Sequence, residues 1–410
     1  MRDPGLLRTN PDFRSLWLAR AGSLFGDWFN QVALAQVTLS LTHSPAAIGL
    51  VLLCRSFPAV LLGPFAGPFV DRFPKKPLLI ATDLSRAACA LGYAFAILFH
   101  ATWILFVGSL LLGIAGVLFN PARAAALPFV VARDDLAAAN ALDAGMTGVV
   151  QVLGAGLGGI VAVAVGPILC FAINAASYLW SAGCILRARW DERRETRATQ
   201  PDYLASLGAG FREAGRNRVA RAIIVIGMSW GLAGGGYYVL IPLLGDRTFH
   251  RGGLGIGILY AIDGIGVLLG AALVRRVVAG NRHKAIVWYG AGYLAQALFF
   301  GLLAQSTTLL VGGAVLLLMR ISSGVIIPLD SYLLQTSTEP GMRGRLFALH
   351  ESTYGGVMQA SYVLTGVAYA RIGIPHTGVV VGAMSLLCGV SWLWQFGAGA
   401  VSALRGSPTR

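Results

Sequence analysis

Charged side chains stand inside several long apolar stretches of the sequence, and these residues are the best placed to do chemistry. Asp27, Arg55, Asp263 and Arg320 each lie well inside such a stretch. A charge at the centre of a bilayer costs about 3 kcal/mol, so it persists mainly beside a cavity or a partner. Because a helix rises about 1.5 Å per residue, their depths allow an Asp27–Arg55 pair and an Asp263–Arg320 pair. We interpret the two aspartates as proton-coupling candidates, with a static salt bridge or contact with a cationic substrate as the alternatives.

Polar residues recur along the stretch around Asp27 at helical spacing. They are Arg20, Ser23, Asp27, Asn30, Gln31 and Thr38. Spacings of three, four and seven put them on one face of a helix. We expect this face to line a central cavity, where Ser23, Asn30 and Gln31 contact the substrate and Arg20 is a further charge partner.

Aromatic residues gather in two neighbouring stretches of the second half. Trp230, Tyr237, Tyr238 and Tyr260 surround a run of three glycines that begins at Gly234. Their rings can stack on an apolar or cationic ligand. Membrane proteins also use such rings as interfacial belts and in packing against lipid. Both interpretations stay open at this point, and the four residues are candidate substrate contacts.

The composition shows what kind of elements must position these residues. Of the 410 residues, 56% are hydrophobic and 12% are charged, and the mean hydropathy is +0.69. Apolar stretches of about 20 residues, each long enough to cross a bilayer as a helix, recur along the whole chain. We predict twelve transmembrane helices near 14–41, 46–70, 77–99, 102–127, 138–164, 167–187, 222–244, 253–274, 285–304, 308–332, 350–373 and 376–403.

One long polar break divides the predicted helices into two groups of six. We expect an N-terminal half at 1–187, a cytoplasmic linker at 188–221 and a C-terminal half at 222–410. Within the linker, residues 203–221 have apolar residues near helical spacing and a basic face, which indicates an amphipathic helix at the headgroups or else a solvated connection.

The net charge of +14 reflects orientation in the membrane rather than binding to nucleic acid. Lys and Arg concentrate in the segments that face one side, and the loops on the other side hold only Arg247, Arg251 and Arg371. By the positive-inside rule, both termini are expected in the cytoplasm of a cell with this chain in its inner membrane. Four carboxylates stand near the predicted cytoplasmic ends, where we expect structural or gating roles: Asp83, Asp143, Asp330 and Glu351.

No pattern in the sequence predicts covalent chemistry or a bound cofactor. The five cysteines lie in apolar stretches without metal-ligand spacing, and the six histidines are scattered, so we expect neither a metal site nor disulfides. The segment GAGLGG at Gly154–Gly159 matches a dinucleotide fingerprint, but no strand precedes it and no acidic residue follows at the required distance. Close helix packing explains it better. Without a P-loop, the proton gradient is the expected energy source.

The loop GPFAGPFVDRFPKKPLL between the second and third stretches resembles the signature loop of the major facilitator superfamily. The matching residues are Gly67, Asp71, Arg72, Lys75 and Lys76, whereas Phe69, Val70 and Pro74 depart from the pattern. The resemblance implies an all-α membrane protein of two pseudo-symmetric six-helix halves. It also implies that the loop gates the cytoplasmic side.

Further segments are similar to one branch of that superfamily, the exporters that include macrolide efflux proteins and the enterobactin exporter. They are FRSLWLARAGSLFGD, LTHSPAAIGL, FNPARAAALPFVV and QTSTEPGMRGRLFAL. Gly154, Gly158 and Gly159 also resemble the end of the antiporter motif, where Ala155 replaces the expected proline. The resemblance implies a proton-coupled exporter of a small amphipathic or hydrophobic molecule such as a drug, siderophore or metabolite. We expect a monomer, and we expect no enzymatic activity because no nucleophile, base and orienting residue occur together. A uniporter, a lipid flippase and a transport-inactive receptor are the alternatives.

The charge asymmetry predicts the topology of the chain. A reporter fused after Arg194 should read as cytoplasmic and one fused after His250 as extracytoplasmic, because positive residues are retained inside. Paired alkaline phosphatase and green fluorescent protein fusions at the two sites measure this. Opposite signals would contradict the two-halves arrangement.

Overall fold

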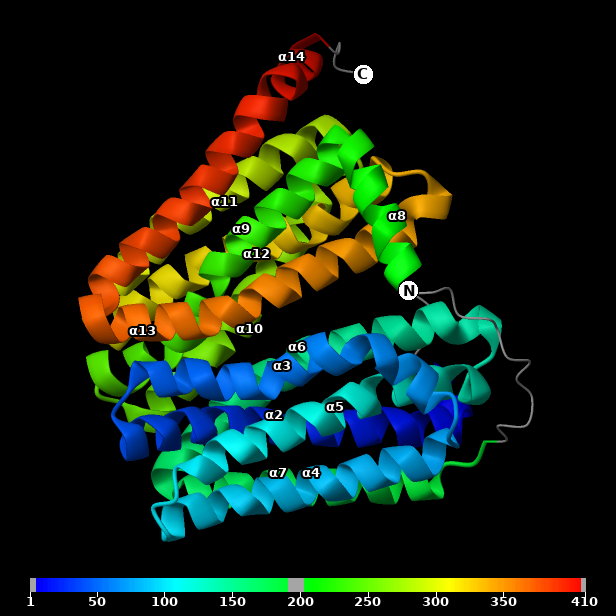
Figure 1. Ribbon diagram of the computed structural model, residues 1–410, viewed down its shortest axis with the longest axis vertical. Coiled ribbons are helices and arrows are strands. Elements are labelled where there is room, and N and C mark those ends of the chain that lie inside the picture. Colours follow the sequence, from blue (N-terminus) through cyan, green and yellow to red (C-terminus); the bar gives the residue numbers. More distant parts are fainter. Residues whose placement is uncertain (1–4, 191–202, 407–410) are drawn as a thin grey trace. The chain divides into compact units, whose positions relative to one another are not determined.

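The computed structural model describes residues 5–190 and 203–406, and all of its regular elements in these ranges are helices (Figure 1). The first half contains α1 Gly5–Thr9, α2 Pro11–Thr42, α3 Pro45–Val70, α4 Lys75–Leu98, α5 Trp103–Val130, the short η1 Arg133–Asp135, α6 Leu136–Ala164 and α7 Pro167–Arg187. The second contains α8 Tyr203–Arg216, α9 Arg218–Leu243, η2 Leu244–Thr248, α10 Gly252–Val277, α11 Arg282–Ala304, α12 Leu309–Thr336, η3 Pro340–Met342, α13 Arg343–Trp392, η4 Leu393–Gly397 and α14 Ala398–Gly406.

Ten helical stretches of the described chain are long and apolar enough to cross a membrane. The helix α2 falls outside this group although it has 32 residues, because its polar stripe lowers its hydropathy. The expected boundary between the last two spans is present as a kink. The backbone of α13 leaves the helical conformation at Gly373, where φ is 78°, so this element consists of two helices that meet there. A glycine adopts this left-handed conformation without strain, so two spans are joined without a loop.

The expected linker is helical in its second part. There α8 covers Tyr203–Arg216, where the sequence predicts an amphipathic helix, and it ends just before Asn217 begins α9. Residues 191–202 of the predicted linker lie outside the described residues.

The two halves repeat with a constant offset along the chain. The helix α10 follows α3 by 207 residues at both ends (252 minus 45 and 277 minus 70), and η3 follows η1 by the same number. Gly166 and Gly373, also 207 apart, both have positive φ, as do His43 and His250. The offset fits an internal duplication without net insertion or deletion between the repeats.

The repeat extends to the hydrogen bonds that fix the helix ends. Asn10 caps α2, and its side-chain amide donates to the carbonyl of Val130 at 2.7 Å. Asn217 caps α9 in the same way and donates to the carbonyl of Ser337 at 2.6 Å. Each asparagine therefore satisfies exposed backbone groups at the start of one helix and the end of another.

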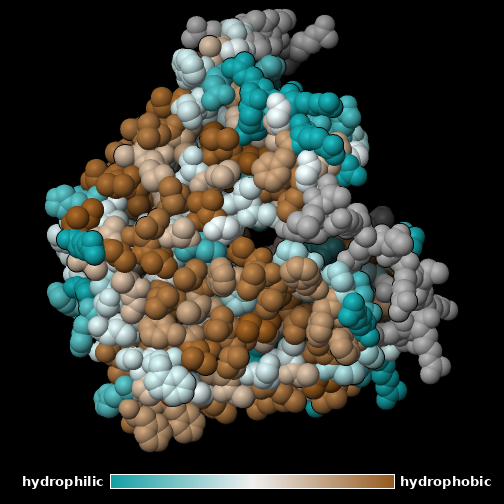
Figure 2. Space-filling model, viewed as in Figure 1, coloured by the Kyte–Doolittle hydropathy of each residue, from teal (hydrophilic) through white to brown (hydrophobic). Residues whose placement is uncertain are grey.

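The helices form two compact units. The N-terminal unit comprises residues 1–200 and 245–261, and the C-terminal unit comprises 201–244 and 262–410. Each unit buries its own apolar core, including Leu16, Leu79 and Phe119 in the first and Tyr289, Leu346 and Trp392 in the second. Exposed apolar side chains cover the outer faces of the helices, and brown hydrophobic residues dominate the visible face of each unit in Figure 2. Such faces suit contact with lipid.

Glycines bring helices of the N-terminal unit into close contact. A Cβ atom at Gly158 would lie 3.0 Å from the Cα atom of Phe29 on α2. One at Gly159 would lie 2.8 Å from the carbonyl oxygen of Gly253 on α10. Gly154 meets α2 in a similar way. The segment GAGLGG is therefore a helix-packing surface inside α6, as the sequence predicts, and not a nucleotide-binding turn.

Replacing one of these glycines should destabilise the contact between α6 and α10. Gly159→Ala forces a shift of backbone atoms, and overpacking of this kind costs about 1–3 kcal/mol. Gly156→Ala on the same helix is the matched control, because its Cβ would meet only the Cβ of Ala261 at 3.9 Å. Thermal unfolding of the purified variants in detergent measures both. Equal unfolding temperatures for the two variants would contradict the packing role.

Candidate functional site

The N-terminal unit contains a cavity of about 570 Å³ between α2, α3, α4, α5 and α7. Asp27 and Arg55 both line it. An Arg55 guanidinium nitrogen donates to Asp27 Oδ1 at 3.4 Å, and the hydroxyl of Tyr178 donates to the same oxygen at 2.5 Å. The side chain of Asp27 is 23% exposed. The carboxylate is thus held by two donors and is also accessible to small molecules.

Some residues of the polar stripe on α2 line this cavity, and others are buried in contacts between helices. Arg20 lines the cavity and interacts electrostatically with Asp27 and Asp143. Ser23 is buried and donates to the carbonyl of Arg20 at 3.2 Å. Asn30 is fully buried, Gln31 is half-buried, and both lie outside the described lining, as does Ser23. These residues lie outside because α2 packs tightly against α6 and α7.

Two further ion pairs stabilise the N-terminal unit. Asp83 pairs with Arg86 one turn along α4, and Arg123 on α5 pairs with Asp143 on α6. The guanidinium of Arg86 also lies 4.5 Å from the centre of the Tyr178 ring. Sequence reasoning placed the two aspartates near helix ends but did not identify their arginine partners, because the pairing depends on how the helices pack.

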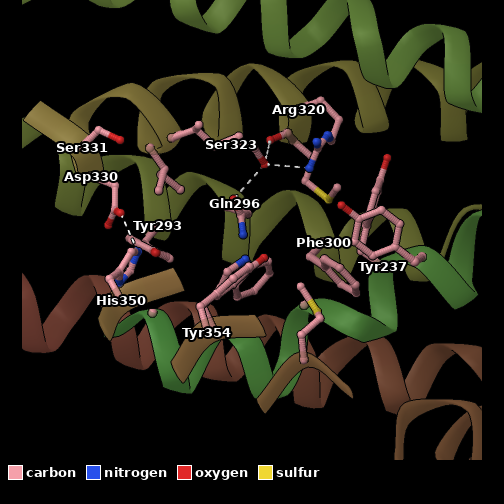
Figure 3. A pocket seen from close by; sticks show the side chains of 18 of the residues that line it. Tyr237, Tyr293, Gln296, Phe300, Arg320, Ser323, Asp330, Ser331, His350 and Tyr354 are labelled. Atoms are coloured by element: carbon pink, nitrogen blue, oxygen red, sulfur yellow. Dashed lines mark hydrogen bonds and ion pairs between the residues drawn. The ribbon is translucent and has the colours of Figure 1, made fainter. Parts of the chain in front are cut away.

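The C-terminal unit contains a second, more aromatic cavity of about 230 Å³ (Figure 3). Trp230, Tyr237 and Tyr238 line it, as does Arg320. Arg320 forms an ion pair with Asp263 and lies 4.6 Å from the centre of the Tyr237 ring. Asp263 is only 4% exposed and lies outside the described lining. Both aspartate–arginine pairs expected from the sequence are therefore present, one in each unit.

Tyr260 does not join the other three aromatic candidates. It is buried in the N-terminal unit, where its ring lies 5.5 Å from that of Trp28. The helix α10 divides between the two units after Ala261, so nearness to Asp263 in the sequence does not place Tyr260 in the cavity of the C-terminal unit.

A polar cluster in the second cavity was not identified from the sequence as a binding site. Asp330 accepts a hydrogen bond from the Tyr289 hydroxyl at 2.6 Å, and its other oxygen lies 2.9 Å from His350 Nε2. Ser323 donates to the amide oxygen of Gln296 at 2.9 Å. In Figure 3, Asp330 and His350 lie near one end of the cavity and Arg320 near the other. The residues come from α11, α12 and α13, so no local motif reveals them.

The signature loop forms a local network of cations and backbone carbonyls. Lys75 lies 3.8 Å from Asp71 and donates to the carbonyl of Val70 at 3.1 Å. Lys76 donates to two carbonyls at the end of α7, those of Leu186 and Ala188. Gly67 lines the first cavity, whereas Asp71 and Arg72 are exposed and lie outside its described lining. The loop therefore ties the end of α3 to α7.

The described residues contain no cluster of three or more His, Cys, Asp or Glu side chains that could hold a metal ion. Their geometry instead provides two cavities with paired charges. A family model described as "Transmembrane secretion effector" matches residues 7–405. The chain belongs to this family. The transmembrane secretion effectors are multi-pass membrane transporters of the major facilitator superfamily, which confirms the family and the fold class expected from the sequence.

Two relatives of this transmembrane secretion effector carry the names of an exporter and an efflux protein. The chain is 26% identical over 375 residues to a putative bacilysin exporter of Bacillus subtilis, covering 88% of this chain and 90% of the relative. It is 22% identical over 400 residues to macrolide efflux protein A of Streptococcus pyogenes, covering 92% and 95%.

Solved transporters share the fold. A nucleoside transporter, NupG, in a mutant form, aligns with a TM-score of 0.75 at 13% identity and covers 94% of this chain and 100% of its own. A bacterial homologue of the iron transporter ferroportin, in an inward-facing state, aligns with a TM-score of 0.74 at 15% identity, covering 94% and 99%.

Asp71 should act on the rate of transport and not on substrate binding. Asp71→Asn weakens the contact with Lys75 at the end of α3 and leaves both cavities intact. We expect turnover to slow while equilibrium binding changes by no more than about threefold, because only conformer populations shift. Transport assays in proteoliposomes and binding to the purified variant measure the two effects. Loss of binding in a folded variant would contradict a gating role.

Proposed function

We propose that this transporter exports a small amphipathic or hydrophobic molecule in exchange for protons. Transport proceeds by alternating access, in which the substrate site opens to each side of the membrane in turn. The exporter names of the relatives support the outward direction. The proposal of proton coupling rests on one observation: the carboxylate of Asp27 faces a cavity inside a membrane-spanning unit.

The carboxylate of Asp27 is more accessible than that of Asp263. The contact of Asp27 with Arg55 is long at 3.4 Å, and its side chain is 23% exposed. Asp263 is 4% exposed and is held by Arg320. A proton can reach Asp27 through the cavity, and protonation releases Arg55 and Tyr178 from a charged partner. Such a change of contacts can bias one conformation over another.

The energy available from a proton is sufficient for modest accumulation. One elementary charge crossing about 100 mV releases about 2.3 kcal/mol, and a tenfold concentration ratio requires about 1.4 kcal/mol. A single proton per substrate can therefore support a gradient of more than tenfold. A uniporter or a lipid flippase of the same fold would show no dependence on the proton gradient.

Asp27→Asn should uncouple transport. The asparagine mimics the protonated carboxyl permanently, so uphill efflux driven by a pH gradient should disappear while downhill exchange of substrate survives in part. Asp134→Asn is the matched control, because Asp134 is exposed in η1 and lies outside the cavity lining. Proteoliposomes with an imposed pH gradient and a panel of amphipathic compounds measure substrate flux and proton flux together.

The contrast between the two transport modes decides the role of Asp27. If the variant still concentrates substrate with normal proton dependence, Asp27 is a structural partner of Arg55 and Asp263 becomes the leading candidate. If both modes are lost in folded protein, Asp27 serves substrate binding. Transport by the wild type without proton movement would contradict the proposed antiport.

A further inference from the structure

The pair Asp330–His350 occupies the repeat position of the pair Arg123–Asp143. Arg123 and Asp330 lie 207 residues apart, as do Asp143 and His350, and 207 is the offset that relates the helices. The first pair therefore joins α5 to α6, and the second joins α12 to α13. Arginine stays protonated at all physiological pH values, whereas histidine gains and loses its proton between about pH 5 and 8. The second half therefore has a pair with a titratable cation at the position where the first half has a pair with a permanently charged cation.

The titratable pair Asp330–His350 faces the cavity of the C-terminal unit. Asp330 and His350 both line it, and so does Gln296. Gln296 is 2% exposed, and the hydrogen bond from Ser323 fixes its oxygen, so its amide nitrogen lacks a partner and is directed into the cavity (Figure 3). His350 is 8% exposed, and its Nδ1 also has no partner. A buried donor and a buried ring nitrogen without partners indicate that a ligand completes them.

The tautomer of His350 follows from its partner. Because Nε2 faces a carboxylate oxygen of Asp330, Nε2 carries the proton in the neutral ring. Nδ1 is then a buried hydrogen-bond acceptor without a partner, on the ring edge that lies next to Gly227. A second proton turns Nδ1 into a donor and gives the ring a positive charge.

The balance of charges favours a cationic ligand. Arg320 is already neutralised by Asp263. Asp330 and Glu351 remain as carboxylates in the lining, and His350 is the only further lining residue able to carry a positive charge. The lining of the first cavity is opposite in character, with Arg20, Arg55 and Arg86 against Asp27.

The shape and composition of the cavity limit the ligand to a compact aromatic molecule. The volume of about 230 Å³ lies below the range typical of drug-sized sites, about 300–1,000 Å³. Six aromatic rings line it: Trp230, Tyr237, Tyr238, Tyr293, Phe300 and Tyr354. Ring faces attract both an aromatic group and an ammonium group.

We infer that the cavity of the C-terminal unit binds a compact aromatic ammonium compound in competition with a proton on the Asp330–His350 pair. The ammonium group lies near Asp330 and Glu351 and donates to His350 Nδ1. The aromatic ring packs among the cavity rings, and an acceptor oxygen receives the free Gln296 N–H. The inference rests on the proposed function in that it names the substrate class of the exporter.

Protonation of His350 opposes this ligand in two ways. It places a positive charge beside the ammonium group, and it removes the only acceptor that the ring offers. The titratable and charged groups that face His350 are Asp330 from α12, Tyr289 and Tyr293 from α11, and Glu351 and Tyr354 from α13 itself. The contact from α9 is uncharged, since Gly227 lies directly against the imidazole. A proton and the ligand therefore exclude each other at this site.

A matched pair of ligands tests the inference on the full chain in lipid nanodiscs. Tyramine carries an ammonium group, and tyrosol carries a hydroxyl in its place on the same aromatic frame. In the wild type at about pH 9, above the range in which histidine normally loses its proton, we expect tyramine to bind at least about tenfold more tightly than tyrosol, about 1.4 kcal/mol. Lowering the pH to about 5.5 should remove that advantage and leave tyrosol binding unchanged. Titration calorimetry measures the affinities.

Three variants separate the roles of the residues. Asp330→Asn retains an acceptor for Tyr289 and should remove most of the advantage of tyramine over tyrosol, with Glu351 providing the remainder. His350→Gln should make tyramine binding independent of pH. Glu351→Gln, at an exposed position of the lining, should weaken tyramine binding by a smaller factor even if the buried variants do not fold. Glu339→Gln is the control, because Glu339 is an exposed carboxylate outside the lining, and should bind both ligands as the wild type does.

The inference is overturned if the wild type binds tyramine and tyrosol equally, or if Glu339→Gln matches the effect of Asp330→Asn. Binding needs no gradient, so the result is independent of the transport assay. Normal binding without proton-driven efflux would overturn the proposed function alone. Proton-driven efflux of other compounds, with no discrimination between tyramine and tyrosol, would overturn only the inference.

Discussion

The cost of placing a charge in hydrocarbon governs the arrangement of this transporter's interior. Each buried carboxylate described above has a cationic or hydroxyl partner, and most partners stand on another helix. Asp27 meets Arg55 and Tyr178, and Asp263 meets Arg320. Removing one member of a buried pair leaves the other uncompensated, at a cost of about 3–5 kcal/mol. The pairs therefore fix which helices are neighbours, and they concentrate the titratable groups around two cavities.

Internal duplication explains why similar contacts serve different chemistry in the two units. The capping asparagines Asn10 and Asn217 make the same hydrogen bonds in both repeats, since every helix end needs its backbone groups satisfied. The pairs Arg123–Asp143 and Asp330–His350 bridge equivalent helices of the two repeats, but their residue types differ. The residues are arginine and aspartate in the first repeat and aspartate and histidine in the second, so a polar contact joins the equivalent helices in both while only the second includes a histidine, which can be titrated.

Glycine contacts and charged cavities make complementary contributions to transport. The glycines of α6 have no side chains, so the backbones of α2 and α10 pack directly against the backbone of α6. The cavities differ in charge, with arginines prevailing in the N-terminal unit and carboxylates in the C-terminal unit. In the proposed function, binding and proton exchange depend on a few side chains, while the packed helices provide the scaffold that positions them.

The sequence alone determined that the chain is helical and spans a membrane, since apolar stretches of about 20 residues match the thickness of a bilayer. It also indicated the family, and it made the two aspartate–arginine pairs plain hypotheses, because a charge inside such a stretch persists mainly beside a cavity or a partner. Only the tertiary structure decided which polar residues share a cavity. Tyr260 is near Asp263 in sequence yet packs against Trp28, whereas Gln296, Asp330 and His350 converge from three helices. Which side chains lie together depends on how each helix is rotated and which helices pack against each other. The hydropathy of the sequence does not predict either.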